Sequence, residues 1–74
     1  MLARRLTAII EREGLGYVSL CPEIDIASQG DSIEEARTNL CEALTLFFET
    51  ASPEEIRQRV HQEVYVTQVD IAVG

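Results

Sequence analysis

Hydrophobic and polar side chains alternate with a period of two through much of the N-terminal part of the chain. Residues 5–21 alternate on both sides of the turn-forming residues 14–16, and this pattern predicts a β-hairpin. Pro22 has no backbone N–H, so we expect it at the end or edge of a strand. Alternation resumes at Ile24 and predicts a third, short strand that ends at Gly30, which we interpret as a position of positive φ just before a helix.

A helical period of three and four replaces the alternation after Gly30. Ser32 suits the N-cap and Glu35 the third helical position. In this capping box the serine hydroxyl accepts from the Glu35 amide, and the carboxylate reaches back to the cap amide. The apolar positions that follow share one face of a long helix and predict that this face is buried. They are Ile33, Ala36, Leu40, Leu44, Phe47 and Ala51, with Cys41 and Phe48 beside them.

The C-terminal third of the chain predicts a short helix and a last strand. Ser52, Pro53 and Glu55 repeat the helix-start pattern, with proline at the first helical position, where its missing donor has no cost. Few apolar residues follow, so we expect this helix to be a lightly packed connector. Residues 64–73 then alternate and are rich in β-branched side chains, which predicts a long strand.

These elements predict an α+β fold with one domain over residues 1–74. The order is β-β-β-α-β, with the short helix before the last strand. Because crossovers between parallel strands are right-handed, the last strand can pair with the first. The result is a two-layer sandwich of sheet order 3-2-1-4, partial RNase H-like, with the main helix on one face.

The other face of the predicted sheet has nothing in this chain to cover it. We therefore expect the chain to form homo-oligomers, dimers or tetramers, through this open face or through the long last strand. The small size of the chain favours the same conclusion, because domains of fewer than roughly 70–80 residues usually need a partner chain or a stabilising cross-link, such as a disulfide or a bound metal. The residues expected at the interface are Ile9, Tyr17, Val64 and Val66.

The chain is acidic, and its charge limits the partners that it can have. It carries a net charge of −7 over 74 residues, and all six of its basic residues are arginines. Affinity for nucleic acids rests largely on cations that neutralise phosphates, so we expect no direct nucleic-acid binding by this chain. The segment from Glu23 to Glu55 is rich in acidic residues and contains a single basic residue, Arg37. This acidic middle is either a solvated surface or a face for a basic partner.

The sequence offers no residues expected to perform catalysis or to bind a metal or cofactor. Nucleophilic catalysis needs an activated Ser, Cys or Lys beside a base, but the single histidine, His61, lies at the end of the weak helix. Cys21 and Cys41 each occupy a position in the apolar pattern of a predicted strand or helix, and we expect both to be reduced thiols in the core.

Acidic residues on or beside the strands could serve a metal-dependent nuclease only if they converged on the ions. Glu23 and Asp25 share one face at a strand edge, whereas Glu11 belongs to the end of another strand. We therefore expect no enzymatic activity.

The N-terminal segment does not have the pattern of a targeting signal. Its basic pair, Arg4 and Arg5, precedes an apolar run that stops at Glu11 and has no small-residue cleavage site. No apolar run approaches the ~18 residues that a membrane span needs. We expect a soluble, cytoplasmic protein.

Residues 16–49 resemble the core signature of a known family. The matching positions are the Gly-Tyr-Val of the second strand, Pro22 with Ile24 two residues later, the run from Ser28 to Ser32, Glu34-Glu35-Ala36, and Leu40 followed by Glu42-Ala43. This pattern is similar to that of the HicB-like antitoxin family, which has a partial RNase H fold without the acidic centre of the nuclease. The match covers about half of the chain without gaps.

The resemblance implies that the protein is the antitoxin of a type II toxin–antitoxin system. It would bind a small basic toxin of the HicA type, an mRNA-cleaving protein that works through a histidine, and cover its active site. Charge and position point to Glu23, Asp25 and Asp31 as the toxin-binding residues. Many family members continue into a C-terminal DNA-binding module that represses their own operon. The sequence to Gly74 contains none, so autorepression is not implied.

An alternative function stays open at this point. The protein could be an orphan member of the family, a homo-oligomeric module of the same fold that binds a ligand or a protein and has no toxin partner. A chromosomal context without a toxin gene would favour this alternative.

Overall fold

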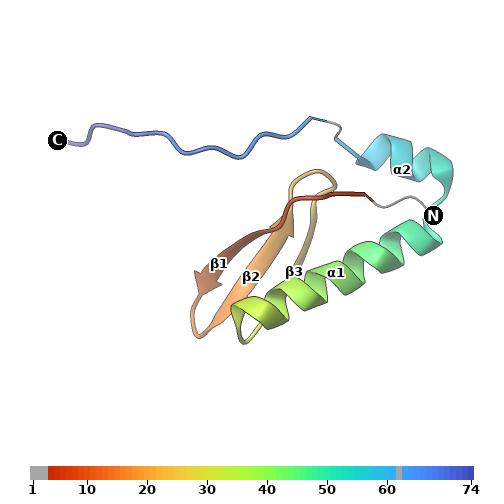
Figure 1. The fold of residues 1–74 in the computed structure, drawn as a ribbon, viewed down its shortest axis with the longest axis horizontal. Coiled ribbons are helices and arrows are strands. Elements are labelled where there is room, and N and C mark those ends of the chain that lie inside the picture. The colour runs from red at the N-terminus through yellow and green to blue at the C-terminus, as the bar shows by residue number, and fades with distance from the viewer. Residues whose placement is uncertain (1–3, 62) are drawn as a thin grey trace.

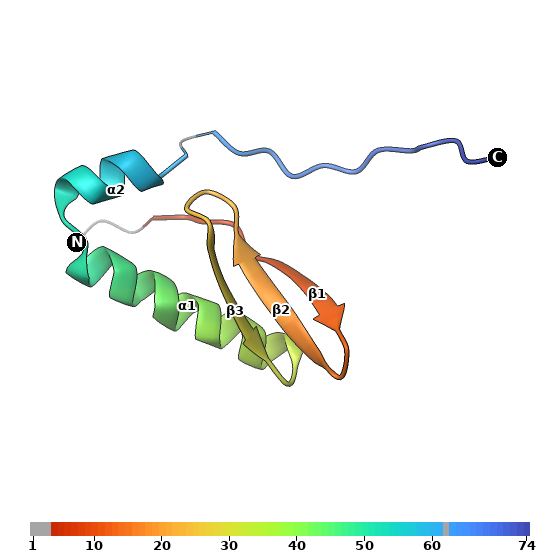
Figure 2. The same cartoon turned by 180° about the vertical axis from the view of Figure 1, so that it is seen from behind.

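Three antiparallel strands and one long helix form two layers in a computed structural model, which describes residues 4–61 and 63–74 (Figure 1). The strands β1 (Ile9–Glu13), β2 (Gly16–Cys21) and β3 (Ile26–Gly30) form one sheet in the order β1-β2-β3. The helix α1 (Ile33–Thr50) packs on one face of this sheet, and the shorter α2 (Pro53–Arg59) follows it (Figure 2). The predicted α+β two-layer arrangement is confirmed.

The first hairpin turns where the sequence predicts. Glu13 pairs with Gly16, so Gly14 and Leu15 form a two-residue loop, and Gly14 has a φ of 60°. A positive φ at the first loop position is typical of a type II′ turn, which matches the twist of the flanking strands. The β1 strand starts at Ile9 and not at residue 5: its last pair with β2 is Ile9 with Leu20, and β2 ends one residue later, at Cys21.

The connection between β2 and β3 differs from the prediction that a strand begins at Ile24. The ladder ends at the pair of Cys21 with Ile26, so residues 22–25 form the turn. The N–H of Asp25 donates to the Cys21 carbonyl at 2.9 Å, and Asp25 has a φ of 57°. Asp is among the few residues that enter this left-handed region readily. Ile24 is a fully buried residue of the turn.

The start of α1 confirms Ser32 as the N-cap. The hydroxyl of Ser32 accepts from the Glu35 N–H at 3.0 Å. The carboxylate of Glu35, however, accepts from the N–H of Asp31 at 3.0 Å, one residue before the predicted cap amide. The carboxylate thus still satisfies a backbone donor in front of the helix.

Gly30 is required by a close contact and not by its φ. Among the glycines that the structure describes, Gly14 alone has a positive φ, so our interpretation of Gly30 was wrong. A Cβ at Gly30 would lie 2.7 Å from the carbonyl carbon of Glu35 and 2.9 Å from the Cα of Ala36. The first turn of α1 therefore rests directly on the end of β3, and glycine is the residue that permits this approach.

The hydrophobic core lies between the sheet and α1. Cys21, Ile24 and Leu40 form its fully buried centre. Ser19 is also buried, and its hydroxyl donates to the Ala36 carbonyl at 2.8 Å, which satisfies the only buried polar side chain described. Partly buried hydrophobic residues surround this centre. They are Leu6, Ile26, Leu44, Phe47, Phe48 and Val60.

Two residues expected in the buried face of α1 are exposed. Ile33 is 54% exposed, and Cys41 is an exposed free thiol, whereas Cys21 is buried as predicted. The exposure of Cys41 follows from the width of the sheet. With three strands instead of four, α1 has no sheet beneath one of its sides, and Cys41 lies on that side.

The second helix starts as predicted and is lightly packed. The hydroxyl of Ser52 accepts from the Glu55 N–H at 3.1 Å, Pro53 occupies the first turn, and no residue of α2 is buried. Its end is attached to the β2–β3 turn, because Arg59 donates to the Ile24 carbonyl at 3.1 Å. No helix in the part of the chain that the structure describes is long and apolar enough to cross a membrane.

The predicted fourth strand does not join the sheet. Residues 63–74, which we call the C-terminal arm, have no strand partner among the described residues, so the observed order β1-β2-β3 replaces the predicted 3-2-1-4. The arm begins beside the β2–β3 turn, where the N–H of His61 donates to the Glu23 carbonyl at 2.6 Å. From there it runs away from the two layers (Figures 1 and 2). Its β-branched residues favour an extended backbone, but a partner for that backbone depends on the tertiary structure.

Candidate interaction surfaces

Glu23 ties the segment before β1 to the β2–β3 turn. Its carboxylate accepts from the Thr7 N–H at 3.0 and 3.1 Å and from the Thr7 hydroxyl at 2.5 Å. The thiol of Cys21 donates to the same carboxylate at 3.4 Å. This predicted toxin-binding residue is therefore engaged within the chain, and a partner would compete with these bonds. The contact joins residues 16 apart, and no local pattern signals it.

These bonds and the burial around them change two pKa values. Burial favours the neutral form of Glu23, but the hydrogen bonds from Thr7 outweigh it and lower the pKa of the Glu23 carboxyl. Burial, followed by the neighbouring Glu23 carboxylate, raises the pKa of the Cys21 thiol. At neutral pH the pair is thus a carboxylate beside a neutral thiol.

The Glu23→Gln substitution is expected to lower the free energy of unfolding by about 1 kcal/mol at pH 7, because the charge-assisted bonds to Thr7 are weakened. The pKa of Glu23 is lower in the folded state than in the unfolded state, where it is about 4.3. Its contribution is therefore present above that pH and is lost as the pH falls through the folded-state pKa. Urea unfolding of both proteins at pH 7 and at pH 3 measures this. An equal difference at the two pH values would contradict it.

The other two predicted toxin-binding residues lie at opposite ends of β3. Asp25 is in the β2–β3 turn with Glu23, and Asp31 follows Gly30 at the far end. Both side chains are exposed. Asp31 lies with Glu13 and Glu35 around an open hollow of about 520 Å³, which Tyr17 also lines. The structure thus brings Glu23 and Asp25 together and places Asp31 in a second group, which we call the acidic end (Glu13, Asp31 and Glu35).

Few of the acidic side chains in the described part of the chain form ion pairs. Of the 13 acidic residues, all except the half-buried Glu23 are exposed. Within residues 4–61 and 63–74 the only ion pair is between Arg57 and Glu54, at 3.4 Å on the exposed face of α2. No group of three or more His, Cys, Asp or Glu side chains in this described part is placed to hold a metal ion.

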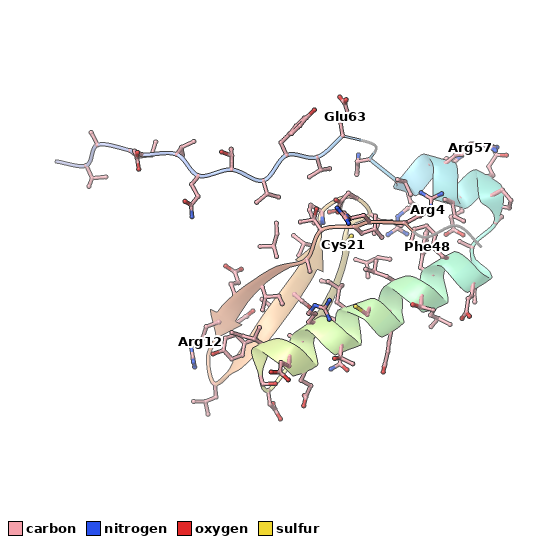
Figure 3. All side chains as sticks on the ribbon, in the orientation of Figure 1. Arg4, Arg12, Cys21, Phe48, Arg57 and Glu63 are labelled. Carbon is pink, nitrogen blue, oxygen red and sulfur yellow. The ribbon has the colours of Figure 1, made fainter. Side chains whose placement is uncertain are left out.

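Half of the six arginines stack on aromatic rings instead of neutralising carboxylates. A guanidinium placed over an aromatic ring is attracted by the electrons of the ring face, and two of the three rings, those of Phe47 and Phe48, also pack against the core. The pairs are Arg4 with Phe48, Arg12 with Tyr17 and Arg59 with Phe47, at 5.0, 4.8 and 5.3 Å from guanidinium carbon to ring centroid. Figure 3 labels the first pair, Arg4 and Phe48.

The residues predicted for the oligomer interface do not form one surface. Ile9 pairs with Leu20 on the face of the sheet opposite α1, and each is 38% exposed. Tyr17 lies on the other face, the one that Ser19 directs toward α1, because side chains alternate along β2. Its hydroxyl accepts from Arg12 at 2.6 Å. Ile9 and Tyr17 therefore lie on opposite faces of the sheet.

Val64 and Val66 lie in the C-terminal arm, far along the chain from Ile9. Val64 is half-buried and Val66 is exposed. The arm carries half of the large hydrophobic side chains that the structure exposes. They are Tyr65, Val66, Val69, Ile71 and Val73 in the arm, and Ile9, Leu15, Leu20, Ile33 and Leu46 elsewhere.

A groove that the sequence pattern does not predict lies between residues 4–8 and α1. It has a volume of about 950 Å³. Apolar residues form much of its lining, and Cys41 and Thr45 lie on its α1 side; the apolar members are Leu6, Ala8, Leu40, Leu44 and Phe48. We predicted that the last strand lies beside the first, but among the described residues β1 pairs with β2 alone.

Comparison with known proteins identifies a relative of this chain. The UPF0150 protein ssl0738 of Synechocystis is 47% identical to it over 60 residues, and the match covers 78% of this chain and 82% of that protein. No protein-family model matches the chain, and no solved structure matches it. The name of the relative states a family and no activity.

Proposed function

Since this chain belongs to the UPF0150 family, we propose that it is the antitoxin of a type II toxin–antitoxin system, of the HicB-like kind that residues 16–49 resemble. It binds a small basic mRNA-cleaving toxin of the HicA type and covers the active site of that toxin, with no catalytic activity of its own. The observation that supports this proposal is the exposed acidic surface, in which the described residues form one ion pair.

Electrostatics gives the proposal its physical basis. A protein that binds RNA presents cations to phosphates, and a partner with a net charge of −7 is attracted to the same surface. Such complementarity raises the association rate and steers the partner to the correct face. The acidic protein then occupies the place of the RNA.

The acidic end is the best candidate for the toxin-binding surface. Asp31 lies there with two further exposed carboxylates around an open hollow. Glu23 is engaged by Thr7, and Asp25 has Glu23 as its acidic neighbour in the turn. Three exposed carboxylates on one surface attract a basic partner more strongly than a single one.

The test of this function starts from the gene beside the one for this chain. If it encodes a short basic protein with a histidine, co-expression is expected to rescue growth and to yield a stable complex. Absence of binding between the two purified proteins in calorimetry would overturn the proposal.

The Asp31→Lys variant is expected to associate with that toxin about tenfold more slowly at low salt, because it reverses a charge at the acidic end. The difference should shrink in high salt, which screens the attraction. Glu54→Lys is the matched control: it makes the same charge change on α2, where the carboxylate already pairs with Arg57. Stopped-flow mixing measures both rates. Equal slowing by the two variants would show that net charge acts without a defined surface.

The second candidate function is the orphan module, a homo-oligomer that binds a ligand or a protein and has no toxin. The exposed hydrophobic residues of the C-terminal arm favour association between copies. A genome with no reading frame for a short basic protein nearby would favour this function over the first.

A further inference from the structure

We propose that two copies of this chain exchange their C-terminal arms. Residues 64–73 of each copy add as a strand to the free edge of β1 in the other copy and fill the groove between residues 4–8 and α1. This inference does not depend on the antitoxin function, because it rests on the arm, the groove and the sheet edge alone.

The arm has the properties of a strand that lacks its sheet. Except for the half-buried Val64, its large apolar side chains are between 61% and 88% exposed, and Figure 1 shows its backbone extended. The period of two places one continuous row of side chains on the same side of the arm, with only Thr67 as a polar member. The row is Tyr65, Thr67, Val69, Ile71 and Val73. A row of this kind is typical of a surface that is covered by another chain.

The shape of the isolated chain supports the same conclusion. Its radius of gyration is 14.4 Å, and its longest dimension is 48 Å. A compact chain of 74 residues has a radius of gyration of about 11 Å. The excess arises from the arm, which extends past the sheet (Figure 1).

The two edges of the sheet differ in their ability to accept a strand. β3 lies under α1, and Asn39 of that helix donates to the Gln29 carbonyl of β3 at 2.8 Å. β1 pairs with β2 and with no other strand in the described part of the chain. An unpaired edge presents N–H and C=O groups to any extended segment, so β1 is the edge that can receive the arm.

The groove beside this edge matches the arm in chemistry and in length. Leu6, Leu44 and Phe48 line it, and the apolar row of the arm would lie against them. Residues 4–13 include β1 and the segment before it. This range and residues 64–73 have the same length, and ten residues of strand span roughly 33 Å. Gln68 and Asp70 alternate with the apolar row, so they would point to the open face of the sheet.

A second copy is the occupant that the geometry favours. The arm begins at the β2–β3 turn, held by His61, and leaves its own sheet without pairing. Reciprocal exchange closes a two-fold dimer in which both free edges and both arms are covered.

The native thiol of Cys41 allows a direct test, because it is exposed and lies on the α1 side of the groove. Single cysteines are introduced at Thr67, Val69 and Ile71 in the full chain, and the proteins are oxidised. At least one variant is expected to form a disulfide-linked dimer through Cys41 of the other copy. The matched controls carry cysteine at Gln68 or Asp70, on the other side of the arm, and are expected to cross-link at least tenfold less.

Three results would overturn the proposal. A disulfide within a single chain would show that the arm folds back on its own groove. Dimers that persist after Cys41→Ser would show that the arms pair with each other. Equal cross-linking at Val69 and at Gln68 would show that the arm has no defined face.

Oligomeric state gives a second, independent measurement. Sedimentation of the unmodified chain is expected to show a dimer of the 8.3 kDa chain. The double variant Val69→Asp with Ile71→Asp is expected to weaken this dimer at least 100-fold, because it places charges against an apolar groove. Gln68→Asp with Ala72→Asp adds as many charges on the other side of the arm and should leave the dimer intact. A monomer for the unmodified chain at micromolar concentration would contradict the exchange.

Discussion

Replacing Gly30 with alanine is expected to lower the free energy of unfolding by about 1–3 kcal/mol or to prevent folding, because the added methyl group has no space. It would lie 2.7 and 2.9 Å from backbone atoms of Glu35 and Ala36, which cannot move aside as a flexible side chain does. To accommodate the methyl group, the start of α1 would have to lift from the end of β3. Urea unfolding followed by circular dichroism measures the loss.

Gly14→Asn is the matched control for this substitution. Gly14 has a φ of 60° and no atom within 4 Å of a Cβ added there. Asn tolerates this backbone conformation better than most residues, so we expect a loss of less than about 1 kcal/mol, since no atom is displaced. A smaller loss for Gly30→Ala than for Gly14→Asn would contradict the close approach of α1 to β3.

Replacing Ile24 with alanine is expected to lower the free energy of unfolding by about 2–5 kcal/mol, the range for large-to-small changes in a core. Ile24 is 0% exposed, and it is among the largest fully buried side chains of a small core. A domain of this size has a total stability of only about 4–11 kcal/mol. The variant should therefore unfold at much lower urea concentration or fail to fold.

Leu15→Ala is the control for Ile24→Ala, because it removes a similar aliphatic group from a side chain that is 98% exposed. We expect a change within about 0.5 kcal/mol. If Ile24→Ala proved equally harmless, the β2–β3 turn would not be part of the core.

The starts of both helices could be predicted because their signals are local. Ser32 and Ser52 each meet an N–H three residues later, and the hydroxyl-to-amide contact involves no other part of the chain. The loop at Gly14 is local in the same way. The exposure of the acidic residues followed from their charge, since an unpaired carboxylate is rarely buried.

Several of the wrong or missing predictions concern contacts between distant segments. The bonds of Glu23 to Thr7 cross 16 residues, and the need for Gly30 arises from the backbone of α1. Cys41 was expected in the core because the helix pattern shows an apolar position but not the width of the sheet beneath it. For the same reason the groove beside α1 could not be anticipated.

The C-terminal arm shows most clearly the difference between what local sequence preference determines and what contacts between distant segments determine. Its alternation and its β-branched side chains are sufficient to predict an extended backbone, because steric preferences of single residues act within the residue and its neighbours. These local preferences do not determine which strand pairs with that backbone. An extended segment has unpaired N–H and C=O groups on both sides, and the free edge that satisfies them is set by how the sheet, α1 and the β2–β3 turn pack together. Local preference therefore predicts an extended backbone for residues 64–73. The packing of the three-stranded sheet leaves one edge of β1 unpaired among the described residues, and we propose that this edge pairs with them.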